Sequence, residues 1–170
     1  MSSTVLLYVE YSSFLENLSG NLKCLKASVV TAGSKHEALE VCSLNREIDL
    51  VLLDIRQQGN DAMQVLARLK KNQPETEVIL LSDHKNIAFA MEGMRQGASD
   101  DITVPFDINS FRKKIQSALR RRKAHLVASR KRTLLNVFED TMMAATFAEA
   151  GEFETAQDIY KGDGKKENID

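Results

Sequence analysis

The sequence alternates five times between a short apolar run and a stretch with helical spacing, from residue 4 to about residue 120. Continuous apolar runs of this kind are typical of strands covered on both faces, as in a parallel sheet. Strands that alternate with helices predict a doubly wound α/β fold, with right-handed crossovers that place helices on both faces. The five runs are Val5–Val9, Ser28–Thr31, Ile48–Leu53, Val78–Leu81 and Asp101–Val104.

Several polar residues predict where the intervening helices begin and end. Ser34 and Glu37 have the spacing of a capping box. Asp61 and Asp107 are expected to cap the third and fifth helices. Gly97 suits a left-handed helix stop.

The chain changes character after the fifth apolar run. Residues 108–138 hold ten basic and no acidic residues, whereas residues 139–170 hold nine acidic and three basic ones. Because no glycine or proline lies between Asp107 and Ala150, the fifth helix either continues far beyond the domain or breaks once near residues 125–132. We expect a domain over residues 1–121, a helical extension over 122–161 and a disordered tail over 162–170.

One aspartate stands out in the stretch LVLLDIRQQGN, because Asp54 directly follows four apolar residues. In doubly wound folds the working site lies at the carboxyl ends of the strands. Glu10 follows the first strand, Ser82 follows the fourth, and Thr103 and Val104 close the fifth. We therefore expect these residues to converge where Asp54 projects.

Four segments in this order resemble the receiver domain of two-component response regulators, over roughly residues 4–121. They are VLLYVEYSSFLENL, DLVLLDIRQQGNDAMQVL, VILLSDH and GASDDITVPF. The resemblance implies a flavodoxin-like five-stranded sheet of order 2-1-3-4-5. It also implies a non-enzymatic signalling module in a phosphorelay.

The resemblance assigns a role to each residue at this edge. Asp54 would take a phosphoryl group from a histidine kinase or phosphotransfer protein. Glu10, Asp54 and the backbone carbonyl of Arg56 would hold Mg²⁺, which prefers hard oxygen ligands. Ser82 and Thr103 would contact the phosphoryl group and take part in the switch.

The sequence departs from the family pattern at several positions: Val9 replaces an acid, Val104 a lysine, Asp101 an aromatic residue, and Gln58 and Ala62 the usual loop proline and glycine. A lysine at position 104 would interact with a partly desolvated phosphoryl group at about 1–3 kcal/mol, as in a charged hydrogen bond. We therefore expect weakened Mg²⁺ binding and slow or absent phosphorylation.

Other functions compete with this interpretation. A pseudo-receiver scaffold of the same fold, which never carries phosphate, is favoured by Val9 and Val104 and disfavoured by Asp54 and Ser82. A haloacid-dehalogenase-like phosphatase would need an acid at position 56, where Arg56 stands. A flavodoxin-like cofactor carrier is disfavoured because the loop after the first strand starts with an acid and has no glycine.

The basic stretch Arg112–Arg132 offers a nucleic-acid-binding alternative. It is disfavoured because no helix-turn-helix or interleaved aromatic residues accompany the charges. We expect contact with an unidentified downstream protein, and pairing of two copies through the basic and acidic segments stays open.

The remaining composition indicates a cytoplasmic protein without a signal peptide or membrane span. Cys24 and Cys42 lack metal-ligand spacing and are expected to be reduced thiols in the core.

Overall fold

The computed structural model describes residues 3–9, 12–44, 48–56 and 59–149. The chain divides into two compact units, Met1–Ala124 and His125–Asp170. The first unit holds the whole sheet and the candidate site.

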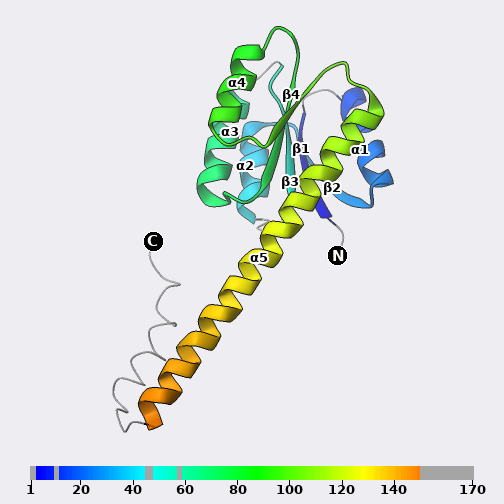
Figure 1. Cartoon of the computed structure of the whole chain (residues 1–170). Coiled ribbons are helices and arrows are strands. Elements are labelled where there is room, and N and C mark those ends of the chain that lie inside the picture. Colours follow the sequence, from blue (N-terminus) through cyan, green and yellow to red (C-terminus); the bar gives the residue numbers. More distant parts are fainter. Residues whose placement is uncertain (1–2, 10–11, 45–47, 57–58, 150–170) are drawn as a thin grey trace. The chain divides into compact units, whose positions relative to one another are not determined.

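The first unit is built on a parallel sheet of five strands in the order β2-β1-β3-β4-β5 (Figure 1). This order is the predicted one, and the strands differ from the predicted runs only at their ends. Their bounds are β1 Ser3–Tyr8, β2 Ala27–Ala32, β3 Leu50–Asp54, β4 Glu77–Ser82 and β5 Asp100–Thr103.

Helices cover both faces of the sheet, as the right-handed crossover rule requires. In Figure 1, α2, α3 and α4 lie on one face, and α1 and the first part of α5 lie on the other. The helices are α1 Ser12–Cys24, α2 Lys35–Leu44, α3 Gly59–Asn72, α4 Ile87–Arg95 and α5 Ile108–Glu149.

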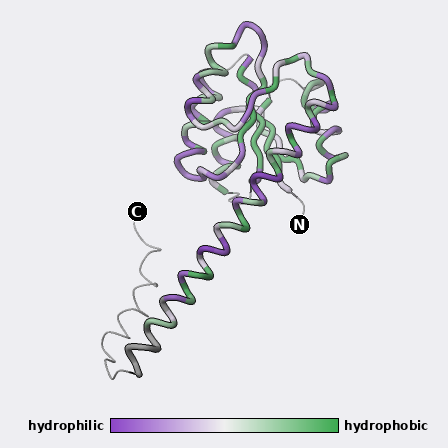
Figure 2. Tube along the Cα trace, viewed as in Figure 1, coloured by the Kyte–Doolittle hydropathy of each residue, from purple (hydrophilic) through white to green (hydrophobic). Residues whose placement is uncertain are grey.

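Each face of the sheet carries its own apolar core, because successive side chains of a strand point to opposite faces. Along β3, Val51 and Leu53 join the core under α2, α3 and α4. Leu50 and Leu52 join the core under α1 and α5. Both faces of the central strands are therefore buried, which explains their continuous apolar sequence (Figure 2).

The predicted start of α2 is confirmed in part. The Glu37 N–H donates to Ser34 Oγ at 3.2 Å, which is the first bond of the capping box. The Glu37 carboxylate accepts instead from the Gly33 N–H at 2.8 Å. At the end of α4, Gly97 adopts a φ of +98°, as expected for a left-handed helix stop.

Of the two aspartates predicted as caps, only Asp107 serves as one. Its carboxylate accepts from the Ser110 N–H at 2.8 Å, and this bond holds the pKa of Asp107 below its usual value. The prediction for Asp61 is wrong because α3 already begins at Gly59. Asp61 therefore lies within the first turn, where it pairs with Lys35 across to α2 at 3.0 Å.

The two cysteines are free thiols in different surroundings. Cys42 is buried between α2 and the sheet, as expected. The core prediction is wrong for Cys24, which is exposed at the last position of α1, because the apolar face of α1 there is formed by Leu18 and Leu22.

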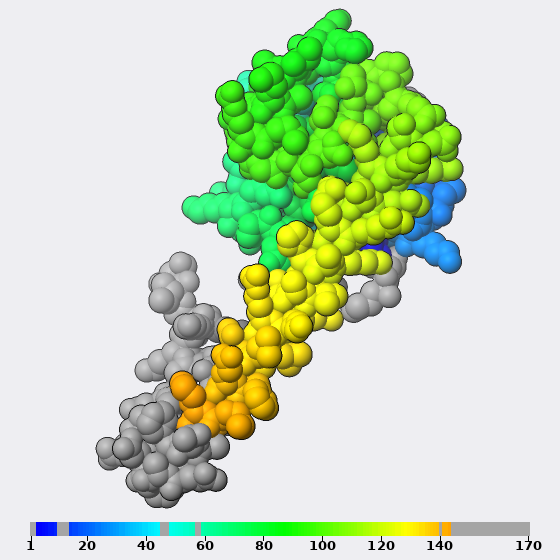
Figure 3. Space-filling view, in the orientation of Figure 1, coloured from blue at the N-terminus to red at the C-terminus, as the bar shows by residue number. Residues whose placement is uncertain are grey.

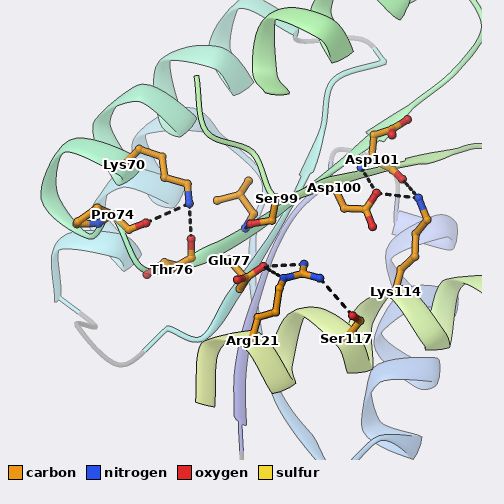
Figure 4. A network of polar contacts seen from close by, with 11 residues as sticks. Lys70, Pro74, Thr76, Glu77, Ser99, Asp100, Asp101, Lys114, Ser117 and Arg121 are labelled. Atoms are coloured by element: carbon orange, nitrogen blue, oxygen red, sulfur yellow. Dashed lines mark hydrogen bonds and ion pairs between the residues drawn. The ribbon is translucent and has the colours of Figure 1, made fainter. Parts of the chain in front are cut away.

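Ion pairs fix the first part of α5 to the sheet. Arg121 binds Glu77 at 2.8 Å, and Lys114 binds Asp100 at 2.8 Å (Figure 4). Arg122 is buried and lies 3.3 Å from Glu75. Three of the ten basic residues of the segment Arg112–Arg132 are thus paired with acids of the first unit, and these three charges are not free for nucleic-acid phosphates.

The second unit contains the remainder of α5, which continues to Glu149 without the break considered near residues 125–132. Its described side chains include several exposed apolar residues, among them Val127, Leu134, Phe138 and Met142. None of the described helices is long and apolar enough to span a bilayer.

We expect Gly93→Ala to lower the free energy of unfolding by about 1–3 kcal/mol, the usual cost of overpacking. Gly93 is where α4 packs directly on the sheet. A Cβ atom there would lie 2.4 Å from Leu80 Cδ1 and 3.3 Å from Met63 Cε, and Leu80 is fully buried. Urea denaturation checks this, with Gly20→Ala as the control, because a Cβ at Gly20 meets no atom within 4 Å.

Candidate functional site

Three of the predicted site residues lie at the same edge of the sheet. Asp54 ends β3 and is paired in register with Leu81 of β4, and Ser82 is paired with Thr103 of β5. Asp54 is 8% exposed and Ser82 is 3% exposed, whereas the side chain of Thr103 is exposed. Glu10, the predicted acid after β1, lies outside the described residues.

The carboxylate of Asp54 is held by Arg56, two residues further along the chain. Arg56 Nε donates to Oδ1 at 2.8 Å, and Nη2 donates to Oδ2 at 2.6 Å. The backbone N–H of Arg56 also donates to Oδ1, at 3.1 Å. This is a bidentate arrangement of guanidinium and carboxylate, the geometry in which such pairs are strongest.

The guanidinium of Arg56 has a second contact that fixes its position. Its central carbon lies 4.4 Å from the centroid of the Phe14 ring in α1, within the range of a cation–π interaction. The side chain of Arg56 is only 17% exposed. The ion pair is therefore screened from solvent on the side of α1.

The loop after β4 supplies a further partner. Asn86 Nδ2 donates to the backbone carbonyl of Arg56 at 3.1 Å and to Asp83 Oδ1 at 2.8 Å. Partial desolvation acts to raise the pKa of Asp83, but bonds from the Lys85 N–H and from Asn86 outweigh it and hold the pKa below its usual value. The N-cap of α4 is Asn86, whose side chain makes no capping hydrogen bond, while Asp83 Oδ1 accepts from the N–H groups of Lys85 and Asn86 just before the helix.

Val9 and Val104, which stand where the family pattern has an acid and a lysine, lie in and against the apolar core. Val9 is 3% exposed, and it joins the core cluster against which Val104 and Phe14 also pack. The Val104 N–H donates to the Ser82 carbonyl at 2.7 Å, which fixes the backbone after β5. At this edge of the sheet, two apolar side chains, Val9 and Val104, therefore replace the acid and the lysine of the family pattern.

The oxygen donors at this edge suit a hard divalent cation. The Asp54 carboxylate and the Arg56 carbonyl are the two predicted ligands within the described residues. Both already have partners within the chain: the Asp54 carboxylate is bound by the Arg56 guanidinium, and the Arg56 carbonyl accepts from Asn86 Nδ2. The parts of the chain that the structure describes contain no group of three or more His, Cys, Asp or Glu residues that could hold a metal ion.

The side-chain contacts of three residues of the site, Arg56, Asn86 and Phe14, were not predicted from the sequence. Sequence reasoning used only the backbone carbonyl of Arg56 and overlooked its side chain, and it did not single out Asn86. The Asp-x-Arg spacing at a strand end was a usable signal for the ion pair. Nothing in the sequence placed Phe14 against that guanidinium, because the contact depends on how α1 packs.

Comparisons with known proteins show the family to which the chain belongs. The family model of the response regulator receiver domain matches residues 7–116. The match covers more than half of the chain, and the chain belongs to this family, whose members are the receiver domains of two-component systems.

Curated relatives match over about half of the chain. The transcriptional regulatory protein GlrR of Escherichia coli is 42% identical over 93 residues, which are 54% of this chain and 20% of that protein. The luminescence regulatory protein LuxO of Vibrio campbellii is 36% identical over 90 residues, 52% of this chain and 19% of that protein. The chain thus matches about a fifth of the length of these relatives.

Solved structures share the fold. NtrX from Brucella abortus superposes with a TM-score of 0.69 at 29% identity, covering 76% of this chain and 29% of that one. A response regulator receiver domain protein from Clostridium thermocellum gives a TM-score of 0.67 at 28% identity, covering 72% of this chain and 98% of that one.

Proposed function

We propose that this chain is a phosphoaccepting receiver in which Asp54 takes a phosphoryl group from a histidine kinase or a phosphotransfer protein. The observation that carries the proposal is the position of Asp54. It is a carboxylate, almost fully buried, at the carboxyl end of the central strand of a receiver fold, next to the strand that ends in Ser82. The proposed role is signalling by contact, with no catalytic turnover of its own.

The chemistry requires a carboxylate oxygen of Asp54 as the nucleophile. It attacks the phosphorus, the bond from phosphorus to the donor's histidine nitrogen breaks, and the nitrogen keeps the electron pair. Glu10, Asp54 and the carbonyl of Arg56 would hold Mg²⁺, which offsets the repulsion between the carboxylate and the phosphoryl oxygens. The Ser82 hydroxyl would donate to a phosphoryl oxygen, with Thr103 on the neighbouring strand.

The signal would leave the domain through its surface. Ile87, Met91 and Met94 of α4 are exposed apolar residues with the spacing of one helix face. Figure 3 shows the surface that residues of α4, β5 and the first turns of α5 form in the first unit. We propose this surface and the extension as contact sites for a downstream protein, in the cytoplasm, a compartment in keeping with two free thiols.

Intact-protein mass spectrometry after incubation with acetyl phosphate and Mg²⁺ tests the acceptor role. We expect wild type to gain one labile phosphate and Asp54→Ala to gain none. Glu92→Ala is the control, since Glu92 is an exposed acid of α4 outside the proposed site and its removal should leave phosphate uptake intact.

A phosphate-independent scaffold is the second candidate function. It is favoured because the apolar side chains of Val9 and Val104 replace the acid and the lysine of the family pattern. It predicts that wild type, folded and soluble in the same assay, gains no phosphate from any donor. A partner would then bind wild type and Asp54→Ala with equal affinity.

A further inference from the structure

The described ligands of the proposed metal site are already satisfied within the chain. Both oxygens of Asp54 accept from Arg56, at 2.8 and 2.6 Å. The Arg56 carbonyl accepts from Asn86 at 3.1 Å. A single residue, Arg56, thus contributes a metal ligand from its backbone and a bound cation from its side chain.

A divalent cation and this guanidinium cannot use the Asp54 carboxylate in the same way at the same time. Oδ1 accepts from Arg56 Nε and from the Arg56 backbone N–H, and Oδ2 accepts from Nη2. Because a carboxylate offers about four lone-pair directions in its plane, Arg56 competes with a metal ion for three of them. The Phe14 ring lies 4.4 Å from the guanidinium in the same conformation, so displacing Arg56 from the carboxylate also disturbs this cation–π contact.

We propose that Arg56 is a built-in competitor of the divalent cation at Asp54, and that Phe14 holds the guanidinium in this position. Metal binding at this site then includes the cost of displacing Arg56 from the carboxylate. The proposal rests on the proposed function only in placing the metal at Asp54, and it makes a prediction about metal affinity that does not involve phosphate.

The loss of the family lysine fits this role. Val104 carries no charge and packs against the core, so it places no cation at the acceptor carboxylate. Val9, likewise apolar and buried, adds no second carboxylate beside Asp54 to attract a metal. Within the described residues, the charge of Asp54 is balanced by the guanidinium of Arg56, two residues further along the chain.

Mg²⁺ titration of the full chain, followed by the backbone amide NMR signals of Ile55 and Arg56 without any phosphodonor, tests the proposal. We expect Arg56→Ala to bind Mg²⁺ about tenfold more tightly than wild type, in line with the loss of a charge-assisted bidentate contact. Arg56→Lys keeps the positive charge but loses the bidentate geometry, so its Mg²⁺ affinity should lie between those of wild type and Arg56→Ala. Phe14→Ala should shift the affinity in the same direction by a smaller factor.

Two control variants make the result specific. Arg95→Ala removes an exposed arginine of α4, whose partner Glu92 lies 3.9 Å away, and should leave Mg²⁺ affinity unchanged. Asp54→Asn combined with Arg56→Ala should abolish the tight binding, because the metal ligand itself is gone.

The proposal is overturned if Arg56→Ala, with a folded amide spectrum, binds Mg²⁺ no more tightly than wild type. It is also overturned if neither protein binds Mg²⁺, or if tight binding survives in the double variant. Tighter metal binding in Arg56→Ala without phosphate uptake by any variant would support the competition and count against the acceptor function. Phosphate uptake by wild type, with the same Mg²⁺ affinity in wild type and Arg56→Ala, would support the acceptor function and overturn the competition by Arg56.

Discussion

Phe111→Ala is expected to lower the free energy of unfolding of the first unit by about 3–5 kcal/mol, the usual cost of truncating a buried aromatic residue. Phe111 is fully buried in the first turn of α5. Its ring stacks on that of Phe106, with centroids 4.9 Å apart and an interplanar angle of 14°. The substitution removes this contact, leaves a cavity and loosens α5 at the point where it meets the sheet.

Urea denaturation followed by circular dichroism measures this effect. The matched control is Phe138→Ala, in the same helix but 62% exposed, which should change the free energy of unfolding by less than about 0.5 kcal/mol. Equal effects of the two substitutions would mean that the core under α5 is not packed as described.

Cys42 is expected to react with iodoacetamide at pH 8 at least about a hundredfold more slowly than an ordinary thiol, because the thiolate is the reactive form. Burial raises the pKa of Cys42 from 9.0 to about 11. A shift of this size lowers the thiolate fraction about a hundredfold at a pH below both values. Burial also blocks access, so the two effects act in the same direction.

The single-thiol variants Cys24→Ser and Cys42→Ser separate the two reactions. Cys24 is exposed, so Cys42→Ser should be alkylated readily while Cys24→Ser resists. Raising the pH towards 11 should speed the reaction of Cys42, and urea should remove its protection. Rapid alkylation of folded Cys24→Ser at pH 8 would contradict the burial of α2 against the sheet.

Much of the fold follows from local patterns in the sequence. The apolar runs of β3 and β4 are typical of strands buried on both faces, and the helical stretches between the runs indicated what covers them. The strand order came from the family resemblance and is the observed one. The start of α3 was misplaced because Asp61 is equally suited to a cap and to the ion pair with Lys35 that it forms.

The sequence predicted which residues share this edge of the sheet, but it did not predict the hydrogen bonds and ring contact that their side chains make. Asp54 and Ser82 could be placed at one edge because parallel strands end on the same side. The bidentate contact of Arg56 depends on a rotamer, and its position over Phe14 depends on the packing of α1. Such contacts between side chains of different elements have no periodic signature in the sequence.

The most direct measurement for the central claim is to locate the phosphate on the chain chemically. Sodium borohydride reduces an aspartyl phosphate to homoserine, with release of phosphate, so the acceptor is marked in a peptide map. After treatment with acetyl phosphate and Mg²⁺, we predict homoserine at position 54 and unmodified aspartate at positions 83 and 101. Homoserine at another acid, or none at all in a folded protein, would contradict the assignment of Asp54 as the phosphoacceptor.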